Sequence, residues 1–549
     1  MPWLTVTLFL PLAGVVFVFL VPRHNEPLAR GIALATTLLT FAASLGVLAN
    51  FDTHAPGYQL VDEATWVASI GLKYAVGVDG ISLFLVLLTA FLFVIAVAAS
   101  FRETVNVRTL MATILALETF VLGAFVSLDL LLFFLFFEAT LLPGYLLIAG
   151  WGGERRAGAA IKFFIYTMAG SAFLFLAVLF VYFQLHTFDI RVLQVTATHL
   201  PVDTARWLFL GFLVAFAVKA PIVPFHAWQP DAYTEAPTGA LLILAGVLPK
   251  IATYGLLRFN IGLFPEAASY FRGLIMVLAL IGIIYGAVVA IVQTDLKRLI
   301  AYSSISHIGF IVLGLFAFTQ QGMSGSVLYM VNHALSTGLL FVMVGLLYER
   351  MRTRDIGRLG GVASVTPKMA AVFLVAGLAS MGLPGLNNFV SEFLVIVGTF
   401  GANHAWGSIA AVGVLLSAIY FLWAYQRAMH GPMSAEVEAR VAAATPTGGD
   451  PASDVPAPDA PARRRRFLDL SRWEYAVVVP VVVVILFLGL YPKPVLDRMN
   501  PATCRAIAQV QHPGAQTLIA ECTRTATLVS ATDRPAKFFA PVGDIPGAP

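Results

Sequence analysis

Long apolar runs, separated by short polar stretches, dominate the chain. Segments of about 17–25 predominantly apolar residues can cross a hydrocarbon core about 30 Å thick. The pattern therefore predicts an all-α polytopic membrane protein with about fourteen transmembrane helices. The expected spans are residues 3–22, 30–50, 80–100, 108–126, 129–150, 159–184, 206–222, 237–258, 271–292, 297–317, 325–348, 368–398, 406–428 and 473–492.

Composition supports this interpretation. Of the 549 residues, 59% are hydrophobic and only 12% are charged, whereas soluble domains carry roughly 25% charged residues. A net charge of +4 is too small to indicate a nucleic-acid partner. The first apolar segment lacks a basic start and a small-residue cleavage site, so we expect a retained helix.

Most lysines and arginines outside the spans fall on one side of the predicted topology, which the positive-inside rule makes cytoplasmic. Both termini are then extracytoplasmic. Residues 431–470, rich in Pro, Ala and Asp, predict a disordered cytoplasmic linker. Its arginines, 463–466, could bind anionic lipid, although a positive-inside signal is the favoured explanation. The few basic residues expected on the other side are Lys73, Arg191, Arg206, Arg258 and Arg272.

Ionisable side chains also occur inside the predicted spans. On insertion scales each charge costs about 2.5–3.5 kcal/mol at a helix centre, so such residues are rare and usually functional. A passive membrane anchor would rarely carry this many. They are Glu118, Glu138, Lys219, Lys250, His307, His333 and Glu392.

Three of these residues stand beside helix breaks. Lys219 precedes two prolines in VKAPIVPFHAW, and Lys250 follows Pro249 in AGVLPKIATYG. Each proline removes an N–H group and frees a carbonyl one turn earlier, that of Ala245 in the second case. Lys219 could face inward towards Glu138, as a static or a switchable pair, or extend to the cytoplasmic surface near His226.

The third break is GLPG, residues 382–385, shortly before Glu392. Either of the two asparagines at 387 and 388 could cap the second half-helix, whose positive end favours a carboxylate. His307 shares a helix face with Ser303, and His333 shares one with two hydroxyl side chains. Two such histidines on consecutive spans suggest a hydrated proton relay, whereas Glu118 could equally serve helix packing.

The breaks in spans seven and twelve lie five spans apart, and an odd offset inverts the topology. We therefore expect two inverted five-helix repeats, an arrangement found in transporters. The expected organisation is spans 1–3 in residues 1–100, a first repeat in 101–260, a second in 261–430, the linker in 431–470, the last span in 471–492 and an extracytoplasmic tail in 493–549.

Three segments resemble a known family. They are FHAWQPDAYTEAPT (225–238), TDLKRLIAYSSISHIGF (294–310) and GLPGLNNFVSEF (382–393). Segments like these mark the antiporter-like membrane subunits of respiratory complex I, which are similar to Mrp-type sodium/proton antiporters. The resemblance covers about residues 75–430. A glutamate at 392 places the chain in the branch of this family that has glutamate, and not lysine, on the broken twelfth helix.

The resemblance implies specific roles. Glu138 and Lys219 would form the pair that modulates proton affinity, and Lys250 would be the central lysine. His307 and His333 would continue the hydrated axis, with the outlet at Glu392; Glu118 also matches a family glutamate. The implied setting is a bacterial plasma membrane, with the antiporter-like subunits L and N and membrane lipids as neighbours.

Redox cofactors would then lie on other chains. This chain has two cysteines, and we find no GxGxxG or GxxxxGK[ST] motif, so we expect no metal or nucleotide site here. FMN, iron–sulfur clusters and quinone are expected on partner subunits. The function implied is proton translocation coupled to electron transfer from NADH to quinone. The alternatives are a cation/proton antiporter subunit of the Mrp type and a membrane scaffold with inert ion pairs.

The tail generates the first prediction. Cys504 and Cys522 enclose 17 residues with a Pro-Gly turn signal on the side expected to be oxidising, so we expect a disulfide that closes a small helical hairpin. A thiol-reactive probe should label neither cysteine until a reductant is added. Labelling of both without reductant would rule the disulfide out.

Overall fold

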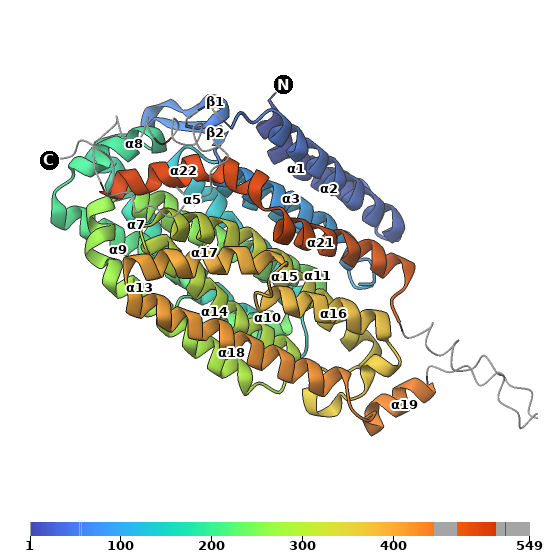
Figure 1. The fold of residues 1–549 in the computed structure, drawn as a ribbon. Helices are drawn as coiled ribbons and strands as arrows, with labels where there is room; N and C mark the ends of the chain where they lie inside the picture. The colour runs from blue at the N-terminus through green and yellow to red at the C-terminus, as the bar shows by residue number, and fades with distance from the viewer. Residues whose placement is uncertain (1, 54, 56, 444–468, 512–521, 523–549) are drawn as a thin grey trace, which may run out of the picture.

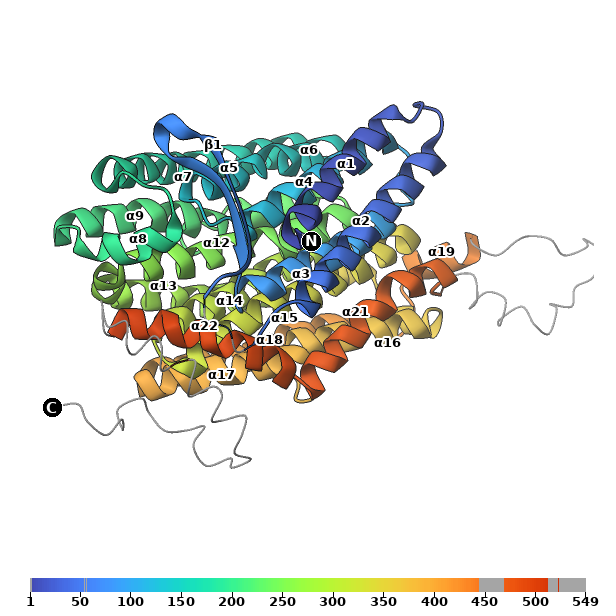
Figure 2. The same ribbon diagram turned by 90° about the horizontal axis from the view of Figure 1, so that it is seen from above.

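Long helices, roughly parallel and antiparallel, form the body of the molecule (Figures 1 and 2). The computed structural model describes residues 2–53, 55, 57–443, 469–511 and 522. The N-terminal half contains α1 (Trp3–Leu20), α2 (Glu26–Ala49), β1 (Gln59–Val67), η1 (Ala68–Ile70), β2 (Leu72–Val78), α3 (Ser82–Ala99), α4 (Val107–Val126), α5 (Leu130–Ala139), α6 (Leu141–Trp151), α7 (Arg156–Leu185), α8 (Ile190–Thr196), η2 (Ala197–His199), α9 (Val202–Lys219) and α10 (Gln229–Glu235).

The second half continues the bundle. Its elements are α11 (Thr238–Gly246), α12 (Leu248–Gly255), the π-helical η3 (Leu256–Ile261), α13 (Pro265–Ile291), α14 (Leu296–Phe316), α15 (Gln320–Met351), η4 (Ile356–Arg358), η5 (Val362–Ser364), α16 (Pro367–Ser380), α17 (Asn387–Ala402), α18 (His404–Met429), α19 (Ala435–Ala443), α21 (Arg472–Leu490) and α22 (Lys493–Gln511).

Among the described residues, twelve helical stretches are long and apolar enough to cross a membrane, and each coincides with a predicted span. The two other predicted spans fall on α9 and on the pair α16 and α17. Both regions are broken, as the prolines and glycines predict: α9 ends at Lys219, and six residues separate α16 from α17. The polytopic helical fold is confirmed, while the count of fourteen stays a prediction.

Matching bridges support the predicted repeats. Asp129 forms an isolated antiparallel bridge with Asp189, and Asp295 forms one with Asp355. The same spacing along the chain separates Asp129 from Asp295 and Asp189 from Asp355. In both pairs the first aspartate begins a long apolar stretch, where its side chain accepts hydrogen bonds from backbone N–H groups. The two aspartates thus begin their helices with the same local device, as equivalent positions of two repeats would; the repeats themselves stay a prediction.

The residues between α2 and α3 form a feature that the span analysis did not predict. β1 and β2 pair as an antiparallel hairpin, with Thr65 opposite Lys73. Gly71 lies between the strands with φ of 68°, in the left-handed region that glycine adopts at no steric cost. The hairpin lies at the same end of the bundle as α8, and α19 lies at the opposite end (Figure 1).

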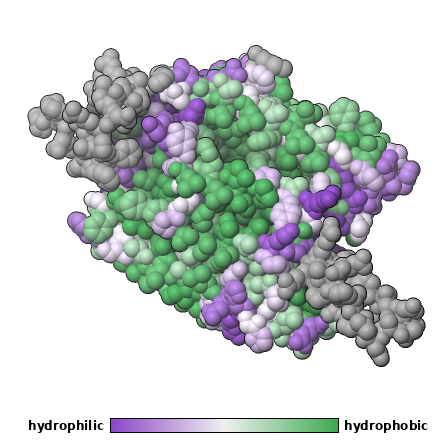
Figure 3. Space-filling view, turned by 45° about the vertical axis from the view of Figure 1, so that its right-hand side comes forward, coloured by the Kyte–Doolittle hydropathy of each residue, from purple (hydrophilic) through white to green (hydrophobic). Residues whose placement is uncertain are grey.

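The outer surface matches a membrane environment. Figure 3 shows a broad hydrophobic area over the middle of the bundle and hydrophilic residues towards its two ends. Large apolar side chains point outward from many helices, which lipid or a partner protein would cover. Examples are Phe17, Leu20, Phe183, Trp207, Leu415 and Leu490.

The structure bears on two predictions about the C-terminal quarter, the linker and the disulfide. A disordered linker over 431–470 is wrong for its first part, because residues 435–443 form α19. Alanine and glutamate favour a helix there, and the Ser434 hydroxyl accepts a hydrogen bond from the N–H of Val437. Cys504 and Cys522 form a disulfide with Cα atoms 5.8 Å apart. The predicted helical hairpin between them extends beyond Gln511 into residues outside the described ranges.

At the end expected to be cytoplasmic, a charged cluster ties α21 to the bundle. Glu474, only 2% exposed, accepts two hydrogen bonds of 2.7 and 2.8 Å from Arg350 and an ion pair of 2.8 Å from Arg102. Ser471 and Glu474 also form a reciprocal capping box that begins α21. Arg102 also forms an ion pair with Glu349, which is more exposed than Glu474.

This cluster predicts a stability effect. Glu474→Gln should destabilise the protein by on the order of 3 kcal/mol, because it removes the buried carboxylate that pairs with both Arg350 and Arg102. Glu349→Gln is the matched control, since that carboxylate is 36% exposed and should matter much less. The thermal unfolding midpoint of the detergent-solubilised protein measures both. Equal midpoints for the two variants would contradict the assignment.

Candidate functional site

Lys219 lies at the break after α9 and points into the protein. Its side chain is 4% exposed, and its ammonium donates hydrogen bonds of 2.8 Å to the carbonyl of Phe137 and to the hydroxyl of Thr140. The Nζ atom also lies 3.6 Å from the centre of the Phe137 ring, a cation–π contact. Because α5 ends at Ala139, the ammonium meets the negative end of that helix.

This geometry settles where Lys219 points. His226 instead contacts the hydroxyl of Tyr285 at 3.3 Å, so the lysine does not extend towards it. Glu138 is only half-buried and is close enough to Lys219 to interact electrostatically. Among the described residues, however, no ion pair within 4 Å joins the two. Lys219 is thus held mainly by a helix end and a hydroxyl, with Glu138 nearby.

Lys250 occupies the second break and is fully buried. α11 ends at Gly246 and α12 begins at Leu248. Pro249 has no N–H, so the carbonyl of Ala245 lacks a helical partner. The Lys250 ammonium takes that place, with Nζ 3.0 Å from the Ala245 oxygen. The residue that follows the proline therefore satisfies the carbonyl that the proline frees.

Lys250 also reaches the first histidine. Its Nζ lies 2.7 Å from Nδ1 of His333 on α15. The ring of His333 lies 5.4 Å, centre to centre, from the ring of His307 on α14. Both histidines are at most 1% exposed. The two histidines are therefore adjacent, as predicted, and Lys250 contacts the first of them, His333.

Tyr329 connects the histidines to Glu392. Its hydroxyl lies 2.7 Å from Nδ1 of His307 and donates a short hydrogen bond to Oε1 of Glu392. His307 also lies 3.6 Å from that carboxylate oxygen. On its other ring nitrogen, His307 contacts the hydroxyl of Tyr420 at 3.2 Å. Sequence reasoning missed both tyrosines, because an isolated tyrosine in an apolar span looks like any other aromatic core residue.

The third break positions Glu392 in an unexpected way. Leu386 precedes α17 and no side chain caps that helix, so the expectation that an asparagine caps it is wrong. Asn387 donates instead to the Asn332 carbonyl, and Asn388 donates to Ser336 and Ser380. The side-chain amides of both asparagines tie the break to α15 and α16. Polar backbone groups buried in a membrane need such hydrogen-bond partners from other helices.

Gly382 in this break leaves room for the carboxylate. Its φ is 74°, and a Cβ atom built there would lie 2.0 Å from Oε2 of Glu392. Any other residue would be strained and would displace the Glu392 side chain. Gly382 therefore both permits the turn and leaves space for the Glu392 carboxylate.

Glu118 lies apart from this line of contacts. It is fully buried in α4, and within the described part of the chain neither carboxylate oxygen has a hydrogen-bond partner. No described contact joins it to Lys250, His307 or Glu392. A buried carboxyl group without partners is costly; both roles of Glu118, in helix packing and in the proton path, stay predictions.

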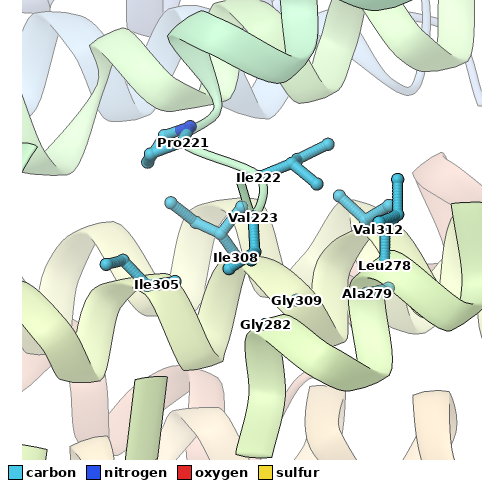
Figure 4. Close-up of a pocket in the computed structure, with 10 residues that line it drawn as sticks. All are labelled: Pro221, Ile222, Val223, Leu278, Ala279, Gly282, Ile305, Ile308, Gly309 and Val312. Atoms are coloured by element: carbon cyan, nitrogen blue, oxygen red, sulfur yellow. The ribbon is translucent and has the colours of Figure 1, made fainter. Parts of the chain in front are cut away.

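An apolar pocket lies directly beside the first break (Figure 4). Pro221, Ile222 and Val223 cover it from one side, and α13 and α14 supply the rest of the wall, including Gly282 and Gly309. Apolar cavities of this kind stay dry. The pocket therefore gives the chain backbone room at the break but is not a polar path. Among the described residues, no group of three or more His, Cys, Asp or Glu side chains could hold a metal ion.

Comparisons with known proteins agree with the geometry. The chain is 40% identical over 552 aligned positions to NADH-quinone oxidoreductase subunit M of Mycobacterium tuberculosis (strain CDC 1551 / Oshkosh), covering 93% of this chain and 95% of the relative. It is 38% identical to subunit M of Rickettsia felis, covering 90% of this chain and 97% of that protein.

Solved structures give the same result for the fold. A chain of respiratory complex I from Thermus thermophilus with bound NADH superposes with a TM-score of 0.80 at 30% identity, covering 92% of this chain and 99% of that one. A chain of the Mrp complex from Dietzia sp. DQ12-45-1b gives 0.79 at 22% identity, covering 94% and 99%, which at this identity supports the fold alone.

The family match covers most of the candidate site. Residues 127–419 match the family described as NADH:quinone oxidoreductase/Mrp antiporter, TM. That range contains Glu138, all three breaks and Glu392. With relatives at 40% identity over nearly its whole length, the chain belongs to the NADH:quinone oxidoreductase/Mrp antiporter transmembrane family.

Proposed function

We propose that this chain is a proton-translocating membrane subunit of an NADH:quinone oxidoreductase. One observation carries the proposal: a line of buried polar side chains runs from Lys250 through His333, His307 and Tyr329 to Glu392, with hydrogen-bond contact at every step except between the two histidine rings. In the membrane interior, where polar groups are costly, such a line serves ion or proton movement more often than structure. Relatives named for this enzyme supply the setting.

The contacts support a specific order of proton transfers. A protonated Lys250 can donate to Nδ1 of His333, 2.7 Å away. The two imidazole rings are not in direct hydrogen-bond contact, so a bridging water would complete this step. His307 Nδ1 can then pass a proton to the Tyr329 oxygen while the Tyr329 hydroxyl proton moves to Glu392. Tyrosine thus ends the step neutral, and Glu392 becomes protonated.

The pair Glu138 and Lys219 supplies control. Glu138 lies at the half-buried surface of α5, where an adjacent subunit can reach it, while Lys219 is held inside by the end of the same helix. A charge that moves in a neighbouring subunit would draw Glu138 towards or away from Lys219. This changes the electrostatic potential at Lys250 and so favours uptake or release of its proton.

Redox chemistry would take place on other subunits. In this assignment FMN, iron–sulfur clusters and quinone are bound elsewhere, and this chain contributes only the proton path. The expected neighbours are the antiporter-like subunits L and N in a bacterial plasma membrane, with both termini extracytoplasmic. The polar path lies within one chain, so this subunit can perform its transfers without groups from its neighbours.

The runner-up function is a subunit of an Mrp-type cation/proton antiporter. The family match, which is described as NADH:quinone oxidoreductase/Mrp antiporter, favours it, and the same polar line would suit exchange driven by an ion gradient. Copurification distinguishes the two. A complex I subunit arrives with flavin and iron–sulfur proteins in an assembly that oxidises NADH, and an antiporter subunit does not.

Lys250 gives the main functional prediction. Lys250→Met keeps the volume of a fully buried side chain but removes the charge, so NADH-driven proton pumping should fall by roughly tenfold or more in an assembled complex. Proton uptake into proteoliposomes, followed with a pH-sensitive dye, measures it. The matched control is Lys368→Met at an exposed position, which should pump normally.

Glu138 tests the control step separately. Glu138→Gln, or Lys219→Ala, should assemble but pump fewer protons per NADH oxidised, because the potential at Lys250 can no longer be switched. If both variants keep the full proton-to-electron ratio, the switching mechanism is wrong. If Lys250→Met also pumps normally, the chain is a scaffold with inert buried charges.

The tyrosine link provides an independent prediction. Tyr329→Phe removes the hydroxyl between His307 and Glu392 and should slow proton pumping by roughly tenfold, since water must replace the hydroxyl. The matched control is Tyr233→Phe, another fully buried tyrosine, whose hydroxyl donates to the Leu244 carbonyl and contacts none of the proposed path residues among the described hydrogen bonds. Pumping rates per assembled complex that are equal in the two variants would exclude Tyr329 from the path.

A further inference from the structure

Two further polar side chains follow Lys250 along the same helical segment. Tyr254 and Arg258 follow Lys250 at intervals of four residues on α12 and η3, so all three lie near one face. Arg258 lies about 12 Å from Lys250 along the helix axis. It belongs to the end of the bundle that the distribution of basic residues makes extracytoplasmic.

Arg258 is locked to an aspartate far away in the chain. It is 8% exposed and makes a short ion pair with Asp79, whose other contacts are the backbone N–H groups of Ile81 and Ser82 at 3.0 and 3.1 Å. The rings of Tyr58 and Tyr254 lie 5.3 and 5.2 Å from the guanidinium.

α22 covers this cluster from outside. A Cβ atom at Gly80 would lie 1.9 Å from the carbonyl oxygen of Arg498, so the helix backbone rests directly on the start of α3. Gln509 fixes its far end by donating to the carbonyls of Gln194 and Gly262 at 2.9 and 2.7 Å. Arg505 of this helix interacts electrostatically with Asp79, Arg258 and Tyr58.

The charges in the cluster do not balance. Arg258 forms the ion pair with Asp79, and Arg505 adds a second positive charge that interacts with it electrostatically. Burial by itself would raise the pKa of Asp79, but the two arginines outweigh it and hold that pKa below its usual value. Asp79 therefore stays ionised, and the cluster keeps an excess of one positive charge.

An arginine cannot relay a proton. Its guanidinium remains protonated in proteins, so it has no vacant acceptor site and releases no proton. Arginines and other fixed positive charges serve as barriers to protons and cations in membrane pores. A proton path between Lys250 and the outer surface through Tyr254 thus meets Arg258, which can neither accept nor release a proton. It also meets a net positive field.

We propose that Arg258 and Arg505, arranged around Asp79, form an electrostatic barrier that stops protons from returning to Lys250 from the extracytoplasmic side. Release is then confined to the branch that ends at Glu392. The proposal rests on the proposed function, because a barrier matters only if Lys250 carries protons. It assigns a role to α22: this helix brings the second arginine to Asp79.

Passive proton leak tests the barrier without turnover. The intact complex is reconstituted into proteoliposomes, a potassium diffusion potential is imposed without NADH, and proton influx is followed with a trapped dye. Arg505→Gln should raise the leak severalfold, because it removes the positive charge that is left over once Arg258 and Asp79 neutralise each other. A leak equal to that of the native complex overturns the proposal.

The matched control lies on the same helix. Arg498→Gln removes an equal charge, but this guanidinium donates to the Pro494 carbonyl on α22 and should leave the leak unchanged. The double variant Arg505→Gln with Lys250→Met should return to the native leak. A leak that persists there, or that also appears in Arg498→Gln, reports general damage and overturns the barrier.

A titratable variant covers the case in which Arg505→Gln does not assemble. With Arg505→His, the leak relative to the native complex should be high near pH 8 and low near pH 5.5, because only the protonated imidazole restores the charge. A ratio independent of pH contradicts the proposal. The two hypotheses fail separately: normal pumping by Lys250→Met rejects the function, whereas lost pumping without a leak in Arg505→Gln rejects only the barrier.

Discussion

A buried ammonium in a membrane protein needs an electronegative partner, and here the backbone supplies it at helix breaks. Among the described residues, three lysines are buried: Lys219, Lys250 and Lys297. Each donates to a carbonyl at or just after a helix end, those of Phe137, Ala245 and Ala236. The breaks expose carbonyls, and the lysines satisfy them. Neither feature would be tolerated in the membrane interior without the other.

This solution keeps the lysines chemically available. An ammonium bound to a carboxylate is held by a full opposite charge, and breaking such a buried pair is costly. A carbonyl offers only a partial charge, so either protonation state of Lys250 can be accommodated beside His333. Arg258 shows the contrasting case at the outer end of the same helix, where a direct ion pair with Asp79 and a group that does not titrate produce a fixed charge.

The arrangement of helices separates the proposed proton path from the proposed barrier. The polar side chains from Lys250 to Glu392 lie on α12, α14, α15 and α17, so the proposed path runs from the end of the first predicted repeat across the second. Its contacts are side chain to side chain, through Tyr329. The cluster around Asp79 instead ties the first repeat to the N-terminal helices and to α22. One branch from Lys250 is therefore built of groups that titrate or rotate, and the other of groups held rigidly.

The sequence by itself determined the spans, the three breaks and the identity of the buried ionisable residues. These follow from local rules: an apolar run of sufficient length, a missing N–H at proline, and the cost of a charge away from water. Tertiary structure alone decided the partners. It turned Lys219 inward, gave Asn387 and Asn388 to neighbouring helices, and brought Tyr329 and Asp79 to residues far away in the chain. Such contacts depend on how whole helices pack, and a tyrosine or aspartate carries no local mark of the group it will meet.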